Sequence, residues 1–345
     1  MSASPEPPRL ALALQGGGAH GAYGWGVLDR LLEEEDFPIV AVSGASAGAL
    51  NGAALVTGLA AGGRQGAKDA LERLWDNVSR NSPLQAFDFG QWAPPLFEPA
   101  LRRSLEVGKL LGRYVAPLSP GLRDMRALRR VVEASIDLSL LTDRRAIPLS
   151  IAATRVASGA ARLFDNAEIT LDALMASACL PDLFGPVTIE GEPYWDGGFS
   201  ANPALEPLIF GGHGQSDLLI VQITPFATQD TPETLVEVMG RMSDIGFNAC
   251  LLRDLKALTQ VQAIARRAPP IDDNFTALAN TNLHLMEASP ALATRGPTGK
   301  IDTRRTQLDG LRELGRETAD AWLHDHGDNL GRGSTLTAAS EAVAV

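Results

Sequence analysis

The chain has 345 residues, 45% of them hydrophobic and 21% charged, a balance that excludes an intrinsically disordered protein and a fibrous repeat. Lys and Arg number 30 against 41 Asp and Glu, and the formal net charge of −11 argues against nucleic acid as the main ligand, because phosphate contacts require a basic surface. The two cysteines, Cys179 and Cys250, are too few for a disulfide framework and have no metal-site spacing, so they are interpreted as reduced, buried thiols.

The N-terminal segment MSASPEPPRL lacks the basic and apolar regions of a signal peptide, and residues 1–8 are expected to form a flexible tail. The longest apolar stretch, Ala47–Gly63, is interrupted by Asn51 and is rich in glycine, so it predicts a buried helix rather than a membrane span. A cytoplasmic location is expected, together with transient contact with a membrane surface.

Two strand–turn–helix units open the chain. Leu10–Leu14 is a short apolar run that predicts a buried strand, and the apolar spacing of Ala19–Glu35 predicts a helix after a glycine turn. Phe37–Val42 is the next predicted strand, and it leads through a second glycine turn into the helix at Ala47–Gly63. Successive units of this kind predict an α/β fold with a mainly parallel sheet.

The rest of the chain is assigned more coarsely. Residues 64–80 predict an amphipathic helix, and 82–120, with many prolines and the aromatic segment Phe87–Phe97, is interpreted as a cap or flap. Residues 9–230 are expected to form one domain, 231–326 a helical region packed on it, and 327–345 a disordered tail. Further predicted elements are a helix at 122–136, a hairpin of Ile147–Thr154 with Ala160–Phe164, a helix at Leu171–Cys179, short strands at Val187–Ile189 and Tyr194–Trp195, and a buried strand at Leu218–Ile223.

The segment Gly44–Gly48 matches G-x-S-x-G, a pattern in which a serine is held on a sharp strand-to-helix turn. Gly44 and Gly48 leave room where the turn brings the backbone close to neighbouring chain. The apolar strand before the motif and the helix-forming run after it make Ser46 a candidate nucleophile. The alternative is a tight strand–helix turn with a capping serine.

The glycine loop at Gly16–Gly21 has two interpretations. Gly16, Gly18 and Gly21 match the G-x-G-x-x-G fingerprint of dinucleotide binding, which also requires an acidic residue after the second strand. Asp36 precedes that strand instead, and the serine turn takes the place where the acid belongs. We therefore favour the second interpretation, in which glycine N–H groups form an oxyanion hole.

A third segment, Asp196-Gly197-Gly198, places a carboxylate on an uncrowded turn. An ordinary Asp-Gly hairpin turn has the same sequence, so this segment by itself identifies no site.

Together, the glycine loop, the serine elbow and the Asp-Gly dipeptide resemble, in this order, the patatin-like phospholipase family over about residues 9–225. Ala176-Ser177 with Pro181, and Asn202-Pro203 after the aspartate, support the resemblance. It implies a three-layer α/β/α fold and a hydrolase acting on acyl esters of lipids, without a metal or cofactor. The family often has Arg or Lys in the glycine loop where this chain has His20.

The same resemblance implies the roles of the site residues. Ser46 is the expected nucleophile and Asp196 the general base. The expected oxyanion hole consists of N–H groups from Gly16, Gly17, Gly18 and Ala47, and the motif glycines are Gly21, Gly44, Gly48, Gly197 and Gly198.

Alternatives remain for both mechanism and function. A Ser-Asp-His triad would need a histidine after the acid, and His213, His284, His324 and His326 qualify by chain order, although none has a distinguishing context. An acyltransferase or thioesterase would use the same two residues. A dinucleotide-binding or catalytically silent interaction protein would use only the glycine loop. The expected partner is a lipid or acyl-ester substrate, and the oligomeric state is open.

Overall fold

The computed structural model describes residues 8–81, 125–181, 183–212, 217–228, 231–293 and 299–336. The predicted cap at 82–120, with its aromatic segment Phe87–Phe97, lies outside the described residues, and so does His213.

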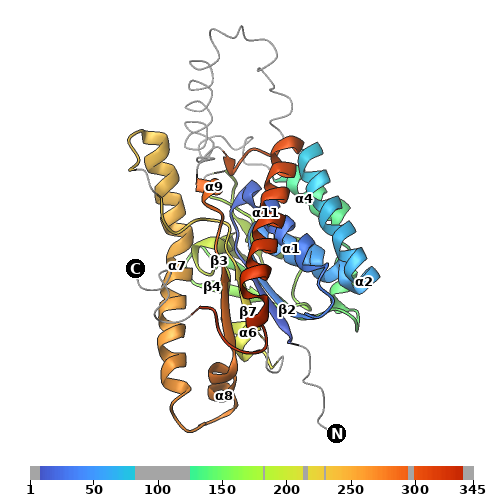
Figure 1. Cartoon of the computed structure of the whole chain (residues 1–345). Helices are drawn as coiled ribbons and strands as arrows, with labels where there is room; N and C mark the ends of the chain where they lie inside the picture. The colour runs from blue at the N-terminus through green and yellow to red at the C-terminus, as the bar shows by residue number, and fades with distance from the viewer. Residues whose placement is uncertain are drawn as a thin grey trace.

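A sheet forms the centre of the molecule (Figure 1), and the described residues contribute eight strands to it. The strands are β1 (Leu10–Leu14), β2 (Ile39–Ala45), β3 (Leu149–Arg155), β4 (Ala161–Phe164), β5 (Val187–Ile189), β6 (Glu192–Asp196), β7 (Asp217–Val221) and β8 (Asn282–Met286). They pair in the order β5-β6-β3-β2-β1-β7-β8, with β4 also beside β3. The pairs from β3 through β2, β1 and β7 to β8 are parallel, whereas β4, β5 and β6 form antiparallel pairs. The predicted α/β fold with a mainly parallel sheet is confirmed.

The first strand shows why helices cover both faces of this sheet. Successive side chains of a strand point to opposite faces, and β1 has the sequence LALAL. Leu10, Leu12 and Leu14 pack in one hydrophobic core, while Ala11 and Ala13 pack in another. A strand that is apolar on both faces requires a covering layer on each.

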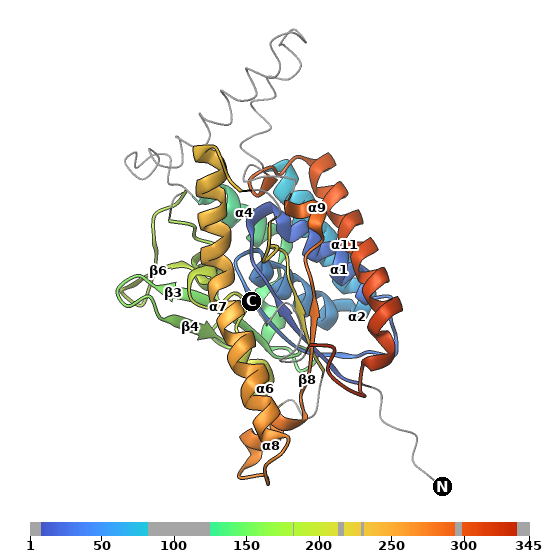
Figure 2. The same cartoon turned by 60° about the vertical axis from the view of Figure 1, so that its left-hand side comes forward.

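Helices supply both layers and give the three-layer α/β/α arrangement (Figures 1 and 2). One face carries α1 (Gly21–Leu31), α2 (Ala47–Arg80), α4 (Arg126–Ser135), α5 (Leu171–Ser177), α9 (Pro290–Ala293) and α11 (Arg305–His326). The other carries α6 (Glu206–Phe210), α7 (Leu235–Ala265) and α8 (Asp273–Asn280). Short 3₁₀ helices are η1 (Gly18–His20), η6 (Leu138–Thr142), η7 (Gly197–Phe199) and η8 (Gly327–Asn329).

Two expectations for the C-terminal third are wrong. Residues 231–326 are not helical throughout, because Asn282–Met286 forms β8, a parallel strand beside β7. Residues 327–336, assigned to a disordered tail, are ordered, and the N–H of Leu336 donates to the carbonyl of Leu283 at 2.9 Å. An edge strand has free N–H and C=O groups, and those of β8 bind this segment.

The two helices predicted at 47–63 and 64–80 form one element, α2, with a kink between them. Gly62 and Gly63 have non-helical backbone angles there. Gly63 has a φ of 61°, a left-handed conformation that glycine adopts without steric cost.

Helix α11 lies directly against α1, with glycines at the contact. A Cβ atom on Gly26 of α1 would overlap the carbonyl group of Arg312 in α11. A Cβ atom on Gly315 of α11 would likewise overlap the carbonyl of Tyr23 in α1. The two backbones approach this closely only because both positions are glycine.

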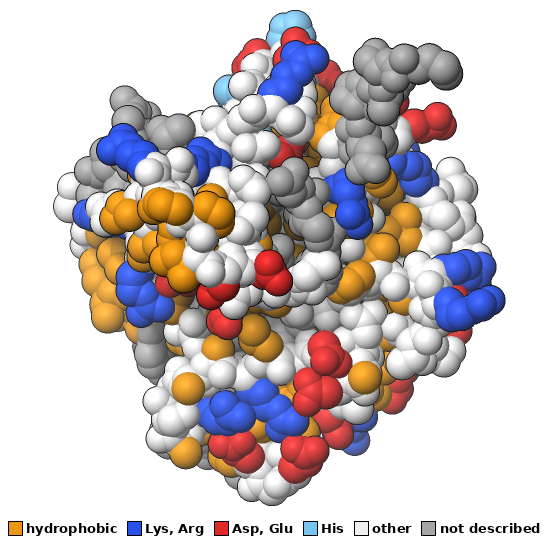
Figure 3. All heavy atoms as spheres, turned by 90° about the horizontal axis from the view of Figure 1, so that it is seen from below, with side chains coloured by type: hydrophobic (Ala, Val, Ile, Leu, Met, Phe, Trp, Pro, Cys, Tyr) orange, Lys and Arg blue, Asp and Glu red, His pale blue; other side chains and the backbone are white. Residues whose placement is uncertain are grey.

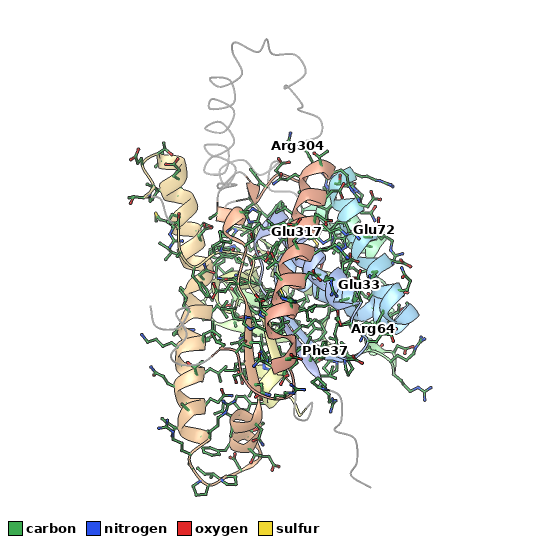
Figure 4. The ribbon with its side chains drawn as sticks, in the orientation of Figure 1. Glu33, Phe37, Arg64, Glu72, Arg304 and Glu317 are labelled. Atoms are coloured by element: carbon green, nitrogen blue, oxygen red, sulfur yellow. The ribbon has the colours of Figure 1, made fainter. Side chains whose placement is uncertain are left out.

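Charged side chains surround the same helix contact, which we call the helix junction. Asp29 of α1 is only 3% exposed and accepts hydrogen bonds from Arg312, at 2.9 Å, and from Arg316. Glu33 accepts hydrogen bonds from Arg316 at 2.9 Å and from Lys68 of α2 at 3.0 Å. Figure 4 shows Glu33 between α11 and α2. The C-terminal helix is thus joined to the N-terminal part of the domain by ion pairs as well as by packing.

Candidate active site

Ser46 lies on a sharp turn between β2 and α2. Its φ of 54° and ψ of −125° are unusual for a residue other than glycine, and the residue is 4% exposed. A Cβ atom on Gly44 would come within 2.5 Å of the Gly48 carbonyl oxygen, and one on Gly48 would overlap the carbonyl of Leu14. The spacing of the G-x-S-x-G motif therefore has a steric cause, and a strained serine backbone is a frequent feature of functional sites.

Asp196 is the last residue of β6, and its side chain is fully buried. One carboxylate oxygen accepts a hydrogen bond from the Gly198 N–H at 2.8 Å and so begins η7. The Asp196 N–H donates to the Cys179 carbonyl at 2.9 Å, and its own carbonyl accepts from the Thr154 hydroxyl at 2.7 Å. The backbone on both sides of this carboxylate is fixed.

The strand registers bring β2 and β6 together end to end. On β3, Ala152 pairs with both β2 and β4, and Ala153 pairs with both β4 and β6. A strand has two edges, so β4 occupies one edge of β3 while β2 and β6 share the other. Ala45 of β2 lies opposite Ala152, and Asp196 lies opposite Ala153, one step of about 3.3 Å along the strand. Ser46 follows Ala45 and therefore lies at the junction where Asp196 ends β6.

A second serine supports this turn. The N–H of Ser46 donates to the hydroxyl oxygen of Ser177 at 3.0 Å, and Ser177 is fully buried at the end of α5. In the sequence, Ala176-Ser177 only supports the family resemblance and has no role of its own. Its place beside Ser46 is decided by the packing of α5.

The glycine loop after β1 lies next to Ser46. A Cβ atom on Gly16 would lie 2.6 Å from the Ser46 Cβ atom, so only glycine fits. The N–H of Gly16 donates to the side-chain oxygen of Asn202 at 2.7 Å. The Gly16 N–H, expected as a donor to an oxyanion, is therefore already occupied by this hydrogen bond. No hydrogen bond to another described residue is found for the N–H groups of Gly17 and Gly18.

The glycine loop also contacts a residue from the C-terminal part of the chain, Lys300, which the sequence analysis did not single out. The backbone carbonyl of Lys300 accepts a hydrogen bond from the Ala19 N–H at 2.8 Å and lies against Gly18, which has a φ of 62°. The Lys300 ammonium group donates to Asp244 at 2.6 Å and to Thr224 at 3.3 Å. Lys300 lies in a turn and belongs to no sequence motif, so no sequence signal predicts this contact.

The described histidines lie in different places. His20 is 2% exposed at the start of α1. His284 is a buried residue of β8, and β7 and β1 separate β8 from β2, a span of about 14 Å across three strand spacings. His324 and His326 are at the end of α11, where the His326 ring packs near Trp322. The structure therefore agrees with the interpretation of His284 as a packed core residue.

Both cysteines are free, and Cys179 is buried as expected. Cys250 is only partly buried, which corrects the expectation of two buried thiols. Its partial burial nevertheless raises the pKa of the Cys250 thiol.

Comparison with protein families identifies the chain. The model of the patatin-like phospholipase family matches residues 12–209, more than half of the chain. The protein therefore belongs to the patatin-like phospholipase family. It is an enzyme of the lipid acyl hydrolase class.

Solved structures resemble the chain more distantly. The crystal structure of VipD from Legionella pneumophila has 16% sequence identity and a TM-score of 0.42, and the match covers 94% of this chain and 68% of VipD. The type III effector protein ExoU has 17% identity and a TM-score of 0.27, with 94% of this chain and 81% of ExoU covered. A search of curated proteins gives no significant match.

Proposed function

We propose that Ser46 and Asp196 form a catalytic dyad that hydrolyses acyl ester bonds of lipids. The observation that carries this proposal is the end-to-end meeting of β2 and β6 on one edge of β3. It supports a carboxylate within reach of the serine hydroxyl, and a serine needs such a base because its hydroxyl is a weak nucleophile.

In the proposed reaction, the Ser46 Oγ forms a bond to the ester carbonyl carbon while its proton passes to the Asp196 carboxylate. The carbonyl electron pair moves to oxygen. When the tetrahedral intermediate collapses, the bond to the alcohol breaks and the alcohol takes the proton from Asp196. Water then attacks the acyl-serine in the same way, and Ser46 and the free fatty acid are released.

Three backbone donors are proposed for the tetrahedral oxyanion. Gly17 and Gly18 supply N–H groups from the glycine loop, and Ala47 supplies the N–H that follows the nucleophile. The N-terminus of α2 adds a partial positive charge close to Ser46. Loss of one such donor typically slows a reaction by about 10²–10³-fold.

Replacement of Ser46 by alanine tests the proposal. We expect Ser46→Ala to reduce the hydrolysis of a short-chain nitrophenyl ester by at least about 10³-fold and to abolish labelling by a fluorophosphonate. Ser43→Ala is the matched control, because Ser43 is also a buried serine, three residues earlier on β2, and its hydroxyl donates to the Ala204 carbonyl at 2.6 Å. Turnover by Ser46→Ala at the wild-type rate would refute the dyad.

The same experiment separates the alternative functions. An acyltransferase would be labelled at Ser46 but would pass the acyl group to an added alcohol faster than to water, and a thioesterase would prefer a thioester over the matching ester. A silent interaction protein would not be labelled. A cytoplasmic location stays a prediction; among the described residues, no helix is long and apolar enough to cross a bilayer.

For the predicted membrane contact we propose the N-terminal half of α7. Four exposed side chains, which we call the α7 stripe, are spaced at three or four residues and so share one helix face: Leu235, Val238, Met242 and Ile245. The opposite face of this half of α7 packs against the candidate active site. Phe247 lies there against Gly198, two residues after Asp196, so closely that a Cβ atom on Gly198 would overlap the Phe247 ring. A lipid surface bound to the stripe would thus lie near the proposed dyad.

The charge around the α7 stripe favours a neutral lipid surface. The helix begins with a capping box that contains Glu237, and the whole chain has a net charge of −11. We therefore expect tighter binding to phosphatidylcholine vesicles than to vesicles that contain anionic lipid, because anionic headgroups would be repelled.

The far end of α7 offers the control for this membrane contact. Val261, Ile264 and Ile271 are also exposed there, and Figure 3 shows hydrophobic side chains on the face at that end of the molecule. Replacement of Leu235 and Met242 by Gln should weaken vesicle binding, whereas Ile264 and Ile271 replaced by Gln should not. An equal effect of both pairs would contradict docking through the stripe.

A further inference from the structure

The amide of Asn202 connects three separate parts of the candidate site. Its side-chain oxygen accepts the Gly16 N–H at 2.7 Å, and its nitrogen lies 3.4 Å from the Gly16 carbonyl oxygen. The same nitrogen donates to the backbone carbonyl of Phe247 in α7 at 3.1 Å. Asn202 is fully buried, and it follows Asp196 by six residues in the loop after β6. One side chain therefore links the glycine loop, the aspartate loop and α7.

Two further buried amides continue this connection. The Gln15 side-chain nitrogen donates to the Asn248 side-chain oxygen at 2.8 Å, next to Phe247 on α7. The Gln15 side-chain oxygen accepts the N–H groups of Ile223 and Thr224 at 2.8 and 2.9 Å. Gln15 and Asn248 are each 2% exposed. The glycine loop is thus linked to α7 directly through Gln15 and, at Gly16, through Asn202.

We infer that Asn202 is a positioning residue that fixes the glycine loop relative to Ser46 and Asp196. The inference rests on the proposed function, because it concerns the donors proposed for the oxyanion. Gly16 contacts the Ser46 turn and directly precedes Gly17 and Gly18 in the chain. A shift of Gly16 would therefore move both proposed donors away from the carbonyl that Ser46 attacks, and catalysis depends steeply on such geometry.

The chemistry of the amide explains why asparagine occupies this position. The site needs one acceptor, for the Gly16 N–H, and one donor, for the Phe247 carbonyl, and an amide supplies both without charge. An aspartate of nearly the same shape would keep the acceptor but lose the donor. It would also place a second buried carboxylate in the loop of Asp196, which a low-dielectric environment strongly disfavours.

The test compares Asn202→Asp with Gln262→Met. Gln262 is a matched control because it is also a buried side-chain amide that donates to backbone carbonyls, of Leu278 at 2.9 Å and Thr281 at 2.6 Å. It lies on α7, at the end of the helix far from the candidate site. We expect Asn202→Asp to lower kcat on a short soluble ester by about 10²-fold, with KM changed less than threefold. Gln262→Met should lower kcat less than threefold, even if it lowers the melting temperature by as much as Asn202→Asp does.

Binding of a trifluoromethyl ketone gives a readout that a purely structural role would not change. This inhibitor forms a charged tetrahedral adduct with a serine and so reports on the oxyanion donors. We expect its affinity for Asn202→Asp to fall by the same factor as kcat/KM. If Asn202→Asp does not fold, Asn202→Ser, whose shorter hydroxyl side chain cannot make both amide hydrogen bonds, takes its place with the same expectation.

The outcomes distinguish the inference from the proposed function. A kcat loss in the Asn202 variant no larger than that of Gln262→Met, or inhibitor affinity that stays at the wild-type level, overturns the positioning role. Full activity of Ser46→Ala would instead refute the dyad, and the positioning role with it, because no oxyanion would then form by attack of Ser46. Loss of activity in Ser46→Ala together with a normal Asn202→Asp would refute the positioning role alone.

Discussion

The candidate site and the helix junction both join distant parts of the chain, but they use opposite chemistry. At the site, Gln15, Asn202 and Asn248 form buried, uncharged hydrogen bonds that join the glycine loop, the loop after β6 and α7. At the helix junction, Asp29 of α1 and Glu33 in the turn after it bind cationic side chains of α11 and α2.

The difference follows from the surroundings of each contact. Neutral amides fix backbone positions in a buried site without adding a charge that would need a partner there. At the helix junction the side chains of Lys68, Arg312 and Arg316 are partly exposed to water, so the charges are tolerated. Glu33 is partly exposed as well, and each of its ion pairs contributes little free energy. The comparison predicts large catalytic effects at the site and smaller, pH-dependent stability effects at the helix junction.

The largest effect is expected from the proposed base. Asp196→Asn should lower kcat by about 10²–10⁴-fold, because an amide cannot take the serine proton at neutral pH. Steady-state kinetics on a short nitrophenyl ester would measure this. Asp217→Asn is the control, because Asp217 is also a buried aspartate, at the start of β7. If Asp196→Asn kept more than about a tenth of kcat, another residue would be the base.

The glycine contact of the helix junction should give the next largest effect, on stability rather than activity. Gly26→Ala or Gly315→Ala should lower the free energy of unfolding by about 1–3 kcal/mol, because the added methyl group overlaps a carbonyl of the facing helix. Gly246→Ala in α7 is the control, since its Cβ atom would meet no described atom within 4 Å, and it should stabilise by up to about 1 kcal/mol. Equal unfolding midpoints in urea for all three variants would contradict the packing argument.

The ion pairs of the helix junction should have a smaller and pH-dependent effect. Burial tends to raise the pKa of Glu33, but hydrogen bonds from Lys68 and Arg316, with their charges, outweigh it and hold the pKa below its ordinary value of 4.5. A depressed carboxyl pKa stabilises the folded state above the unfolded pKa, and this contribution is lost as the pH falls through the folded pKa.

Glu33→Gln should therefore be less stable than wild type by at most about 1 kcal/mol at pH 7, since Glu33 is partly exposed. The difference should shrink as the pH falls below 4.5, and urea unfolding at several pH values would measure it. Glu317→Gln, which removes one charge on the exposed side of α11 (Figure 4), is the control variant. If the stability difference between Glu33→Gln and wild type grew as the pH fell, the expected direction of the pKa shift of Glu33 would be wrong.

Histidine substitutions should have the smallest effect. His284→Gln, His324→Gln and His326→Gln should each keep kcat within about tenfold of wild type, far less than the loss of a general base. A drop of several thousandfold in a variant that still folds by circular dichroism would replace the dyad with a triad.

Parts of this molecule could be predicted from short stretches of sequence. LALAL predicted β1 with its exact bounds, and G-x-S-x-G predicted the turn at Ser46, because apolar runs and glycine spacing act through local sterics. β8 was missed, since Asn282 and His284 interrupt an apolar pattern only five residues long within a region of helical periodicity.

The site itself shows where such prediction ends. The sequence by itself determined the candidate nucleophile and the glycines around it, because these depend on residues within a few positions along the chain. Asp196 became the candidate base only through the resemblance of three separate segments to one family. Only the tertiary structure decided that β2 and β6 meet at β3, that Asn202 takes the N–H of Gly16, and that Lys300 closes over the loop. These contacts join residues far apart in the sequence, and strand register and close packing, which no local pattern encodes, select the partner of each.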